Sequence, residues 1–490
     1  MDTGMGRRRG MPTLPGIRAL PAQSPIAVGR PIHRAQFRLP TPERSSRWRS
    51  DSLGNVGHEG NCARRRNATR RFKVRRRASR TCLTPRPPRL TIVSESVAPP
   101  SGYEAPFAES ERSTVGIEWE LALVDVDTGD MRQAAPAIMA ELDQSGDHPH
   151  IQQEFMQNAV ELVSGVCHTI KGAGQDIYQT SHQLRAISDP MRVGLISSGT
   201  HPFATWQTQK ITEAKRYRTV IDRAASLGQQ IAIFGVHTHV GVESREKVLP
   251  IINSMLSYQP YLQALSASSP YFNGADTGYA SIRAILFQQL PTAGLPYQFT
   301  TWDQWSAYVD DLLSTGVINS LGELHWDIRP AGRYGTIEVR VCDGTSNVAE
   351  LLAMSALTHC LVESLSEKLD RGEEMPTLPA WFVAENKWRA ARYGLDARIV
   401  VDQAGTQAPL RELVPQLVAQ LRPTARLLEC EPELLGVLDI LGIGAGYERQ
   451  RQVYHRSRQA GASDHEALEA IVAHLVAEMR ADHPINPLSC

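Results

Sequence analysis

Residues 114–123 restrict the fold of this chain more than any other segment, and they read Thr-Val-Gly-Ile-Glu-Trp-Glu-Leu-Ala-Leu. The large apolar side chains fall on every second residue, at Val115, Ile117, Trp119, Leu121 and Leu123. Side chains of a β-strand alternate between the two faces of a sheet, so this period of two predicts a half-buried strand. The same period places Glu118 and Glu120 together on the opposite face. The segment therefore predicts a sheet with one apolar and one ionisable face.

Two further segments repeat this asymmetry. Residues 231–242 place His237 and His239 on one face, with Phe and Val side chains on the other. Residues 336–341 place Glu338 and Arg340 on one face, with Ile and Val side chains turned away. Three strands with an apolar back and an ionisable front are thus expected to lie in one sheet.

Helical signals separate and follow these strands. Capping boxes precede apolar stripes at Asn347–Glu350 and Ser463–Glu466, and helical periodicity covers 170–189, 208–227 and 303–315. The strands show no regular strand–helix–strand rhythm. The pattern predicts an α+β domain in which helices surround a largely antiparallel sheet.

The ionisable face carries groups that a protein interior does not tolerate alone. Burying an unpaired carboxylate is costly and adjacent carboxylates repel each other, so either a cation lies between them or water reaches them. Mg²⁺ prefers carboxylate and phosphate oxygens, and Mn²⁺ also accepts imidazole. The alternative is an ordinary solvated face of an antiparallel sheet. The same asymmetry on three strands, and the aromatic composition around Glu118, favour a metal site.

Glu154 and Glu161 are two further candidates, separated by seven residues. They share one face if residues 152–163 are helical and lie on opposite faces if the segment is extended. The spacing leaves both arrangements open.

The N-terminal part of the chain differs from the rest. The first hundred residues hold 22 Lys and Arg against 5 Asp and Glu, whereas the remainder hold 30 against 47. We therefore predict a disordered Arg/Pro-rich extension over 1–108 and a folded domain over 109–490. Three explanations of the extension stay open: a dispensable or misassigned start, an organellar targeting segment, and an arm that binds nucleic-acid backbones.

Other features exclude several classes of protein. No uninterrupted apolar run of about 18 residues occurs, so no membrane partner is expected. The seven cysteines are scattered without a CxxC pair, which argues against a disulfide framework or structural zinc and favours the cytoplasm. We interpret Cys167, Cys342 and Cys360 as buried small hydrophobes, and the glycines of 442–446 as a helix end or turn. Homo-oligomer formation is left open.

Several of these segments, in the same order, resemble motifs of the glutamate–cysteine ligases, and most closely the bacterial type 2 carboxylate-amine ligases. The resemblance covers roughly residues 110–485. The stretches that carry it are 116–120, Glu154 followed by Glu161, 235–240, 276–283, 325–330, 336–343 and 385–394.

The resemblance implies a glutamine-synthetase-like fold, in which a curved sheet forms a funnel lined with metal-binding acids. It implies that two or three Mg²⁺ ions are held by Glu118, Glu120, Glu154, Glu161, His237 and Glu338. It also places Arg340 near a transferred phosphate. The chemistry of guanidinium groups suggests Arg283 and Arg329 as substrate-binding residues. No ligand role is carried onto His239.

The expected reaction is ATP-dependent formation of γ-glutamylcysteine through a γ-glutamyl phosphate, as in glutathione-type thiol biosynthesis. The small-molecule partners would be ATP, glutamate and cysteine. Two alternatives remain: a ligase for another acceptor amine with weak cysteine activity, and a nucleic-acid-associated protein that acts through its basic extension.

Overall fold

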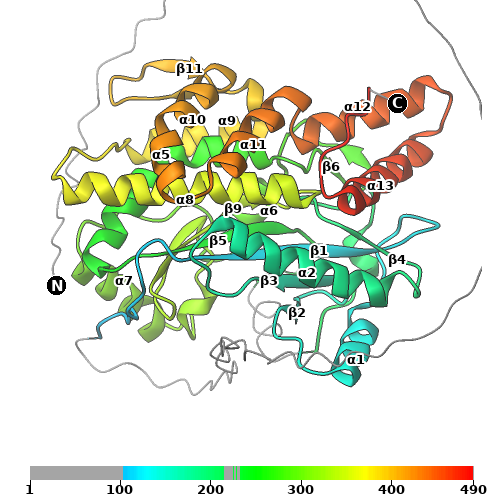
Figure 1. The fold of residues 1–490 in the computed structure, drawn as a ribbon, viewed down its shortest axis with the longest axis horizontal. Coiled ribbons are helices and arrows are strands. Elements are labelled where there is room, and N and C mark those ends of the chain that lie inside the picture. The colour runs from blue at the N-terminus through cyan, green and yellow to red at the C-terminus, as the bar shows by residue number, and fades with distance from the viewer. Residues whose placement is uncertain (1–102, 214–223, 226–227, 229–231, 489–490) are drawn as a thin grey trace, which may run out of the picture. The chain divides into compact units, whose positions relative to one another are not determined.

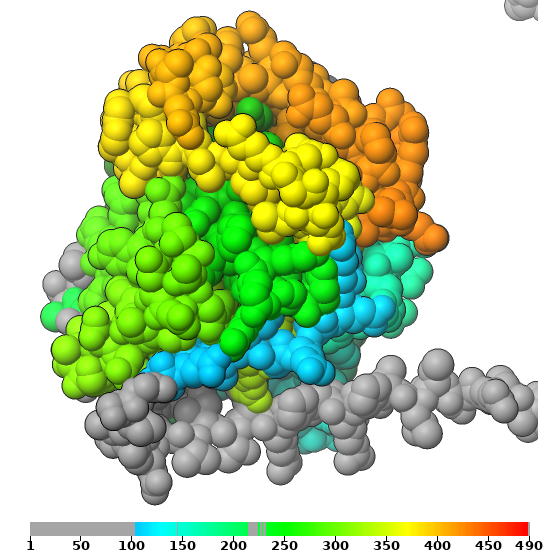
Figure 2. Space-filling view, turned by 90° about the vertical axis from the view of Figure 1, so that its left-hand side faces the viewer, coloured from blue at the N-terminus to red at the C-terminus, as the bar shows by residue number. Residues whose placement is uncertain are grey.

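The computed structural model describes residues 103–213, 224–225, 228 and 232–488. Most of the expected extension, and most of the expected helix 208–227, lie outside these residues. Residues 103–108 are packed: the Ala105 N–H donates to Ser306 Oγ at 3.0 Å, and Trp302 Nε1 donates to the Ala105 carbonyl at 3.0 Å. Figure 2 shows this segment in blue beside light-green residues. Ala105, which we had placed in the extension, thus contacts the folded part of the chain, and the bounds of the two parts stay a prediction.

Seven strands of the described chain form one antiparallel sheet, in the order β2-β3-β1-β5-β9-β8, with β4 paired to the far end of β1. The strands are β1 (Val115–Asp125), β2 (Ile151–Gln153), β3 (Ala159–Val163), β4 (Val193–Ile196), β5 (Gly235–Gly241), β8 (Ile328–Ala331) and β9 (Thr336–Asp343). The three predicted strands are β1, β5 and β9, and they lie side by side. The α+β fold with an antiparallel sheet is confirmed.

The apolar back of the sheet faces a layer of long helices. α2 (Ile170–Ser188), α5 (Arg245–Ser266) and α8 (Val348–Asp370) contact this side, and Figure 1 shows α8 running along the sheet. Ile117 and Trp119 are fully buried in this core. The Trp119 indole N–H donates to the Thr345 carbonyl at 3.2 Å, so the buried polar atom of this side chain is satisfied.

The front of the sheet changes character along β1. After Glu120 the same face carries Ala122 and Val124, which pack against Ile471 and Val472 of α13 (Asp464–Ala481) in a second apolar core. The ionisable part of the front therefore ends at Glu120, and α13 closes the sheet beyond it.

The remaining elements complete the helical layers and edges. They are α1 (Ala135–Ser145), α6 (Arg283–Phe287), α7 (Trp302–Ser314), α9 (Ala380–Tyr393), α10 (Leu410–Leu427), α11 (Glu431–Ile443), α12 (Gly446–Gln459), two small sheets of β6 (Tyr271–Phe272) with β7 (Ala275–Asp276) and β10 (Arg398–Val400) with β11 (Gln407–Pro409), and short 3-10 turns at Trp206–Thr208, Leu321–Glu323 and Gly394–Asp396.

Several local predictions are confirmed. Asn347 caps α8 by accepting from the Glu350 N–H, and Ser463 caps α13 with Glu466. The glycine-rich stretch ends α11, where Gly444 has a φ of 103° that favours glycine.

The burial expected of the cysteines is met only in part. Cys342 and Cys360 are buried, but Cys167, which forms a β-bridge with Val115 at the start of β1, is half-buried.

α8 is the one helix of the described chain that has the length and hydropathy of a membrane span. Of its most apolar window, 83% is buried inside the protein. Its apolar composition is therefore accounted for by its place in the core, between the sheet and the outer helices.

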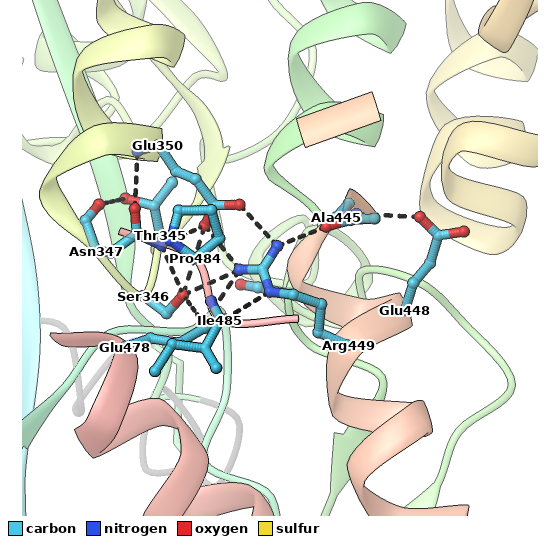
Figure 3. A network of polar contacts seen from close by, with 12 residues as sticks. Thr345, Ser346, Asn347, Glu350, Ala445, Glu448, Arg449, Glu478, Pro484 and Ile485 are labelled. Atoms are coloured by element: carbon cyan, nitrogen blue, oxygen red, sulfur yellow. Dashed lines mark hydrogen bonds and ion pairs between the residues drawn. The ribbon is translucent and has the colours of Figure 1, made fainter. Parts of the chain in front are cut away.

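A buried ion cluster joins the three helices α8, α12 and α13 (Figure 3). Arg449 of α12, 1% exposed, binds Glu350 of α8 bidentately at 2.7 and 2.8 Å. Its Nε also donates to Glu478 of α13 at 2.7 Å. Burial alone would lower the pKa of the guanidinium, but the two carboxylates outweigh it and raise that pKa. One cation thus compensates two buried anions.

Replacing Arg449 with Met should destabilise the protein by about 3–5 kcal/mol, because two buried carboxylates lose their compensating charge. Urea unfolding of the full chain measures the effect. Arg480→Met is the matched control: its ion pair with Asp189 is half-exposed and should contribute at most about 1 kcal/mol. Equal losses in the two variants would contradict the role assigned to Arg449.

Candidate metal and active site

Strand pairing brings the predicted acids and the imidazole together. β1 and β5 pair with Glu118 opposite His237, and β1 and β3 pair with Glu120 opposite Glu161. Glu338 enters from β9, which pairs with the other edge of β5. Side chains at paired positions point to the same face, so register alone assembles the cluster.

Two groups of potential metal ligands result, and they share one imidazole. The first contains Glu118, His237 and Glu338, and the second contains Glu120, Glu161 and His237. Within each group the ligand atoms lie within 4.8 Å of one another. His237 and Glu338 are each 2% exposed, so the alternative of an ordinary solvated sheet face is wrong.

The hydrogen bonds of His237 leave one ring nitrogen available. Its Nδ1 lies 2.9 Å from a Glu118 oxygen, and its buried Nε2 has no hydrogen-bond partner among the described residues. That Nε2 is 3.9 Å from Glu120 Oε1. Burial, with the nearby Arg340 charge, lowers the pKa of His237 to about 4. A neutral imidazole that donates from Nδ1 to a carboxylate presents its Nε2 lone pair to a metal.

Three carboxylates crowd the second group. Burial and the charge of Glu154 raise the pKa of Glu120 to about 7, although one of its oxygens accepts the Gly235 N–H. Burial and the charges of Glu118, Glu154 and Glu120 raise the pKa of Glu161 well above its usual range. An added positive charge would favour the ionised form of these carboxylates, and a divalent cation would supply it.

The segment that holds Glu154 and Glu161 is neither one helix nor one strand. Gln152 of β2 pairs with Glu161 of β3, so the two acids lie on opposite arms of a turn. Glu154 follows β2 in the connecting loop and approaches Glu120 and Glu161 from there. The structure thus brings both predicted acids to the site by an arrangement that neither of our alternatives included.

Glu338 is held by two guanidinium groups. Arg329 of β8 binds it through Nε at 2.8 Å and NH2 at 3.2 Å, and Arg340 also forms an ion pair with it. Burial would raise the pKa of Glu338, but Arg329, Arg340 and His239 outweigh burial and hold that pKa well below its usual range. The Arg340 Nε is buried and has no hydrogen-bond partner among the described residues, so it can still donate to a ligand.

Arg283 lies inside the wall of the site and is 3% exposed. Its guanidinium is 3.9 Å from Asp343 and stands over the Phe287 ring. A Cβ on Gly235 would come within 2.2 Å of Arg283 NH2, so the absence of a side chain at Gly235 allows this close approach. Arg283 contributes positive charge beneath Glu120. Its role in substrate binding stays a prediction.

The buried, unpartnered Nε2 of His237 and the acids beside it fit a divalent metal. Oxygen ligands predominate and one imidazole joins them, a donor set that suits Mg²⁺ or Mn²⁺. The Nε2 of His237 would join Glu120 and Glu161 in holding one ion, and Glu118 and Glu338 offer carboxylate oxygens at a second position.

Two residues near the cluster were not assigned roles from the sequence. His239 Nε2 lies 3.3 Å from Glu118 Oε1, and its Nδ1 lies 2.9 Å from Thr336 Oγ1. The Tyr334 ring stands edge-on to His239 at 5.7 Å. The alternation of β5 already pointed to His239, whereas Tyr334 lies in a turn, where periodicity carries no information.

Comparisons with solved structures agree with this architecture. The glutamate–cysteine ligase from Francisella tularensis in complex with AMP is 14% identical, with a TM-score of 0.53 over 77% of this chain and 90% of that one. The bifunctional glutathione synthetase from Pasteurella multocida is 14% identical, with a TM-score of 0.54 over 76% of this chain and 52% of that one. The sheet and its helices define a glutamine-synthetase-like ligase fold.

Sequence comparison identifies the family. The model of glutamate–cysteine ligase family 2 matches residues 114–474. A relative from Mycobacterium sp. (strain JLS), provisionally named a glutamate–cysteine ligase 2-1, is 48% identical over 78% of this chain and 98% of its own length. A relative of the same provisional name from Arthrobacter sp. (strain FB24) is 47% identical over 76% and 98%. The chain belongs to glutamate–cysteine ligase family 2.

Glu120→Gln and Glu161→Gln should each weaken Mn²⁺ binding by at least about 10-fold, because each removes a charged ligand while keeping the side-chain shape. Titration of free Mn²⁺ by electron paramagnetic resonance measures the affinity. Glu469→Gln, a similar change at a 39% exposed acid of α13, should leave it unchanged. Wild-type affinity in both site variants would refute the metal site.

Proposed function

We propose that this protein is an ATP- and Mg²⁺-dependent carboxylate-amine ligase that joins the γ-carboxylate of glutamate to the amine of cysteine. The observation that carries the proposal is the pair of ligand groups sharing His237 on the front of the sheet. Membership of glutamate–cysteine ligase family 2 supports the substrate names. On the same basis we assign the reaction to thiol biosynthesis, and the scattered cysteines lead us to propose the cytoplasm.

The proposed reaction has two steps. The γ-phosphoryl group of ATP first passes to the glutamate γ-carboxylate, which releases ADP and makes an acyl phosphate. The acceptor amine then attacks the acyl carbon, phosphate leaves, and the nitrogen loses a proton. The first step is needed because a carboxylate is a poor electrophile. When bound, Mg²⁺ would neutralise the phosphate charge and favour transfer.

The side chains of the site would then have distinct tasks. Arg340, through its unpartnered Nε, would donate to an oxygen of the transferred group. The ion pairs between Glu338 and its two arginines fix the direction of the Arg340 guanidinium before substrate arrives. The low exposure of His237 and Glu338 limits the water that could hydrolyse an acyl phosphate.

The acceptor is the open part of this proposal. A ligase for another amine, with weak cysteine activity, would use the same potential metal ligands and differ only where the acceptor binds. An acceptor screen that identifies each ATP-dependent product by mass separates the two.

Purified full-length protein with ATP, Mg²⁺ and glutamate should release ADP when cysteine is added, with γ-glutamylcysteine found by mass. Glu120→Gln should lower kcat by about 100-fold or more, since a lost electrostatic stabiliser of a transition state has effects of that order. Glu469→Gln is the control and should keep wild-type activity.

ADP release with other amines but not with cysteine would overturn the acceptor and keep the ligase. Failure with every amine would overturn the ligase.

A further inference from the structure

The turn between β8 and β9 is held firmly at the border of the site. The Ala108 N–H donates to the Gly332 carbonyl at 2.7 Å, and the Val242 N–H donates to the Gly335 carbonyl at 3.1 Å. A Cβ on Gly332 would come within 2.1 Å of a backbone oxygen of the 103–108 segment. The backbone of the turn is thus anchored on both sides, and its exposed side chains are Arg333 and Tyr334.

Tyr334 connects this turn to the metal face, which is the side of the sheet that carries the two groups of potential metal ligands. Its ring meets His239 edge-on at 5.7 Å, while the residue stays 49% exposed. Burial raises the pKa of Tyr334, and the carboxylates of Glu118 and Glu338 raise it further. The turn therefore lies where the metal face meets solvent.

Arg333 is available to an external ligand. Its guanidinium lies over the Tyr334 ring, 5.7 Å from the centroid. Within the described part of the chain, no carboxylate lies within ion-pair distance of it. Arg329 and Arg340, by contrast, are both engaged by Glu338. Arg283 is buried in the wall.

The charge of the site explains why such a group is useful. Five acids line or approach the metal face: Glu118, Glu120, Glu154, Glu161 and Glu338. Glutamate and ATP are anionic, so this face repels them until cations compensate it. A guanidinium at its border offers an anion a first favourable contact, and its planar fork suits both carboxylate and phosphate oxygens.

We propose that Arg333, oriented by the Tyr334 ring, binds an anionic group of an incoming substrate at the border of the metal face. That group is a carboxylate of an amino acid or a phosphate of the nucleotide. The inference rests on the proposed ligase function and assigns to Arg333 the substrate contact that we had expected of Arg329. Arg329 then acts as a positioning residue for Glu338.

Arg333→Gln should raise the KM of one anionic substrate by about 5- to 10-fold, the order expected for one charge-assisted hydrogen bond at a partly exposed site, with kcat within about 2-fold. Arg333→Lys should recover part of the loss. Arg371→Gln, at a 53% exposed arginine near the end of α8, is the matched control.

A raised KM for ATP alone identifies the phosphate, and a raised KM for glutamate or the amino-acid acceptor identifies the carboxylate. Unchanged KM values for all substrates, or a fall in kcat alone, would overturn the proposal.

Equilibrium binding separates this inference from the ligase proposal. Calorimetric titrations of ATP, of glutamate and of cysteine, each with Mg²⁺, need no turnover. If wild-type protein binds any of these three ligands and Arg333→Gln weakens that binding by about 5-fold or more, the inference holds even if no amine supports ADP release. Equal binding by the two proteins, or no binding by wild type, overturns it.

Two variants of Tyr334 test whether its ring orients Arg333. Tyr334→Phe keeps the ring that contacts Arg333 and His239, and it should behave as wild type. Tyr334→Ala removes the ring, and it should reproduce at least half of the KM increase seen with Arg333→Gln. A Tyr334→Ala protein with wild-type KM values would show that the ring does not orient Arg333.

Discussion

The structure depends on how like charges are tolerated on one buried face of a sheet. Glu118 and Glu120 of β1 lie beside Glu161 of the adjoining β3, so their charges make Glu161 harder to ionise. The chain itself compensates only part of this charge. Glu338 is paired with Arg329 and Arg340, whereas Glu120 and Glu161 keep raised pKa values. The second pair is therefore the part of the face that gains most from a bound cation.

The free-energy cost of burying these charges is offset by the apolar side chains buried on the opposite face of the sheet. Ile117 and Trp119 alternate with Glu118 and Glu120 on β1, and both apolar side chains are completely buried. Fully burying a large apolar side chain contributes about 1.5–3 kcal/mol, and three strands repeat the pattern. A slip of one residue would exchange the two faces, exposing the apolar set and burying the acids against helices. Strand register is thus set by the same alternation that assembles the site.

Period-two reasoning predicted the parts of the site that lie within long strands. Glu118, Glu120, His237, Glu338 and Arg340 follow directly from alternation and from three strands sharing a sheet.

The contribution of Glu154 to the site could not be predicted from alternation, because it depends on the turn after β2, which no periodicity describes. The place of Arg283 inside the wall could not be predicted either, since it depends on the missing side chain at Gly235, and its role in substrate binding stays a prediction. The packed segment 103–108 was missed because its contacts are with residues some two hundred positions away.

β9 shows how the fold holds the side chains of the candidate site in place. At its start, Thr336 contacts the His239 imidazole at 2.9 Å. At its end, Asp343 accepts from Ser269 Oγ at 2.6 Å and from Ser281 Oγ at 2.8 Å. The chain then enters α8 through Ser346, which belongs to the buried Arg449 cluster.

Polar contacts buried at both ends of one strand fix its position along the sheet more strictly than apolar packing does, because a small shift would leave them unsatisfied. Glu338 and Arg340 lie between these two anchors. Their geometry is therefore set by the strand before any ligand binds, which is what preorganised electrostatic catalysis requires.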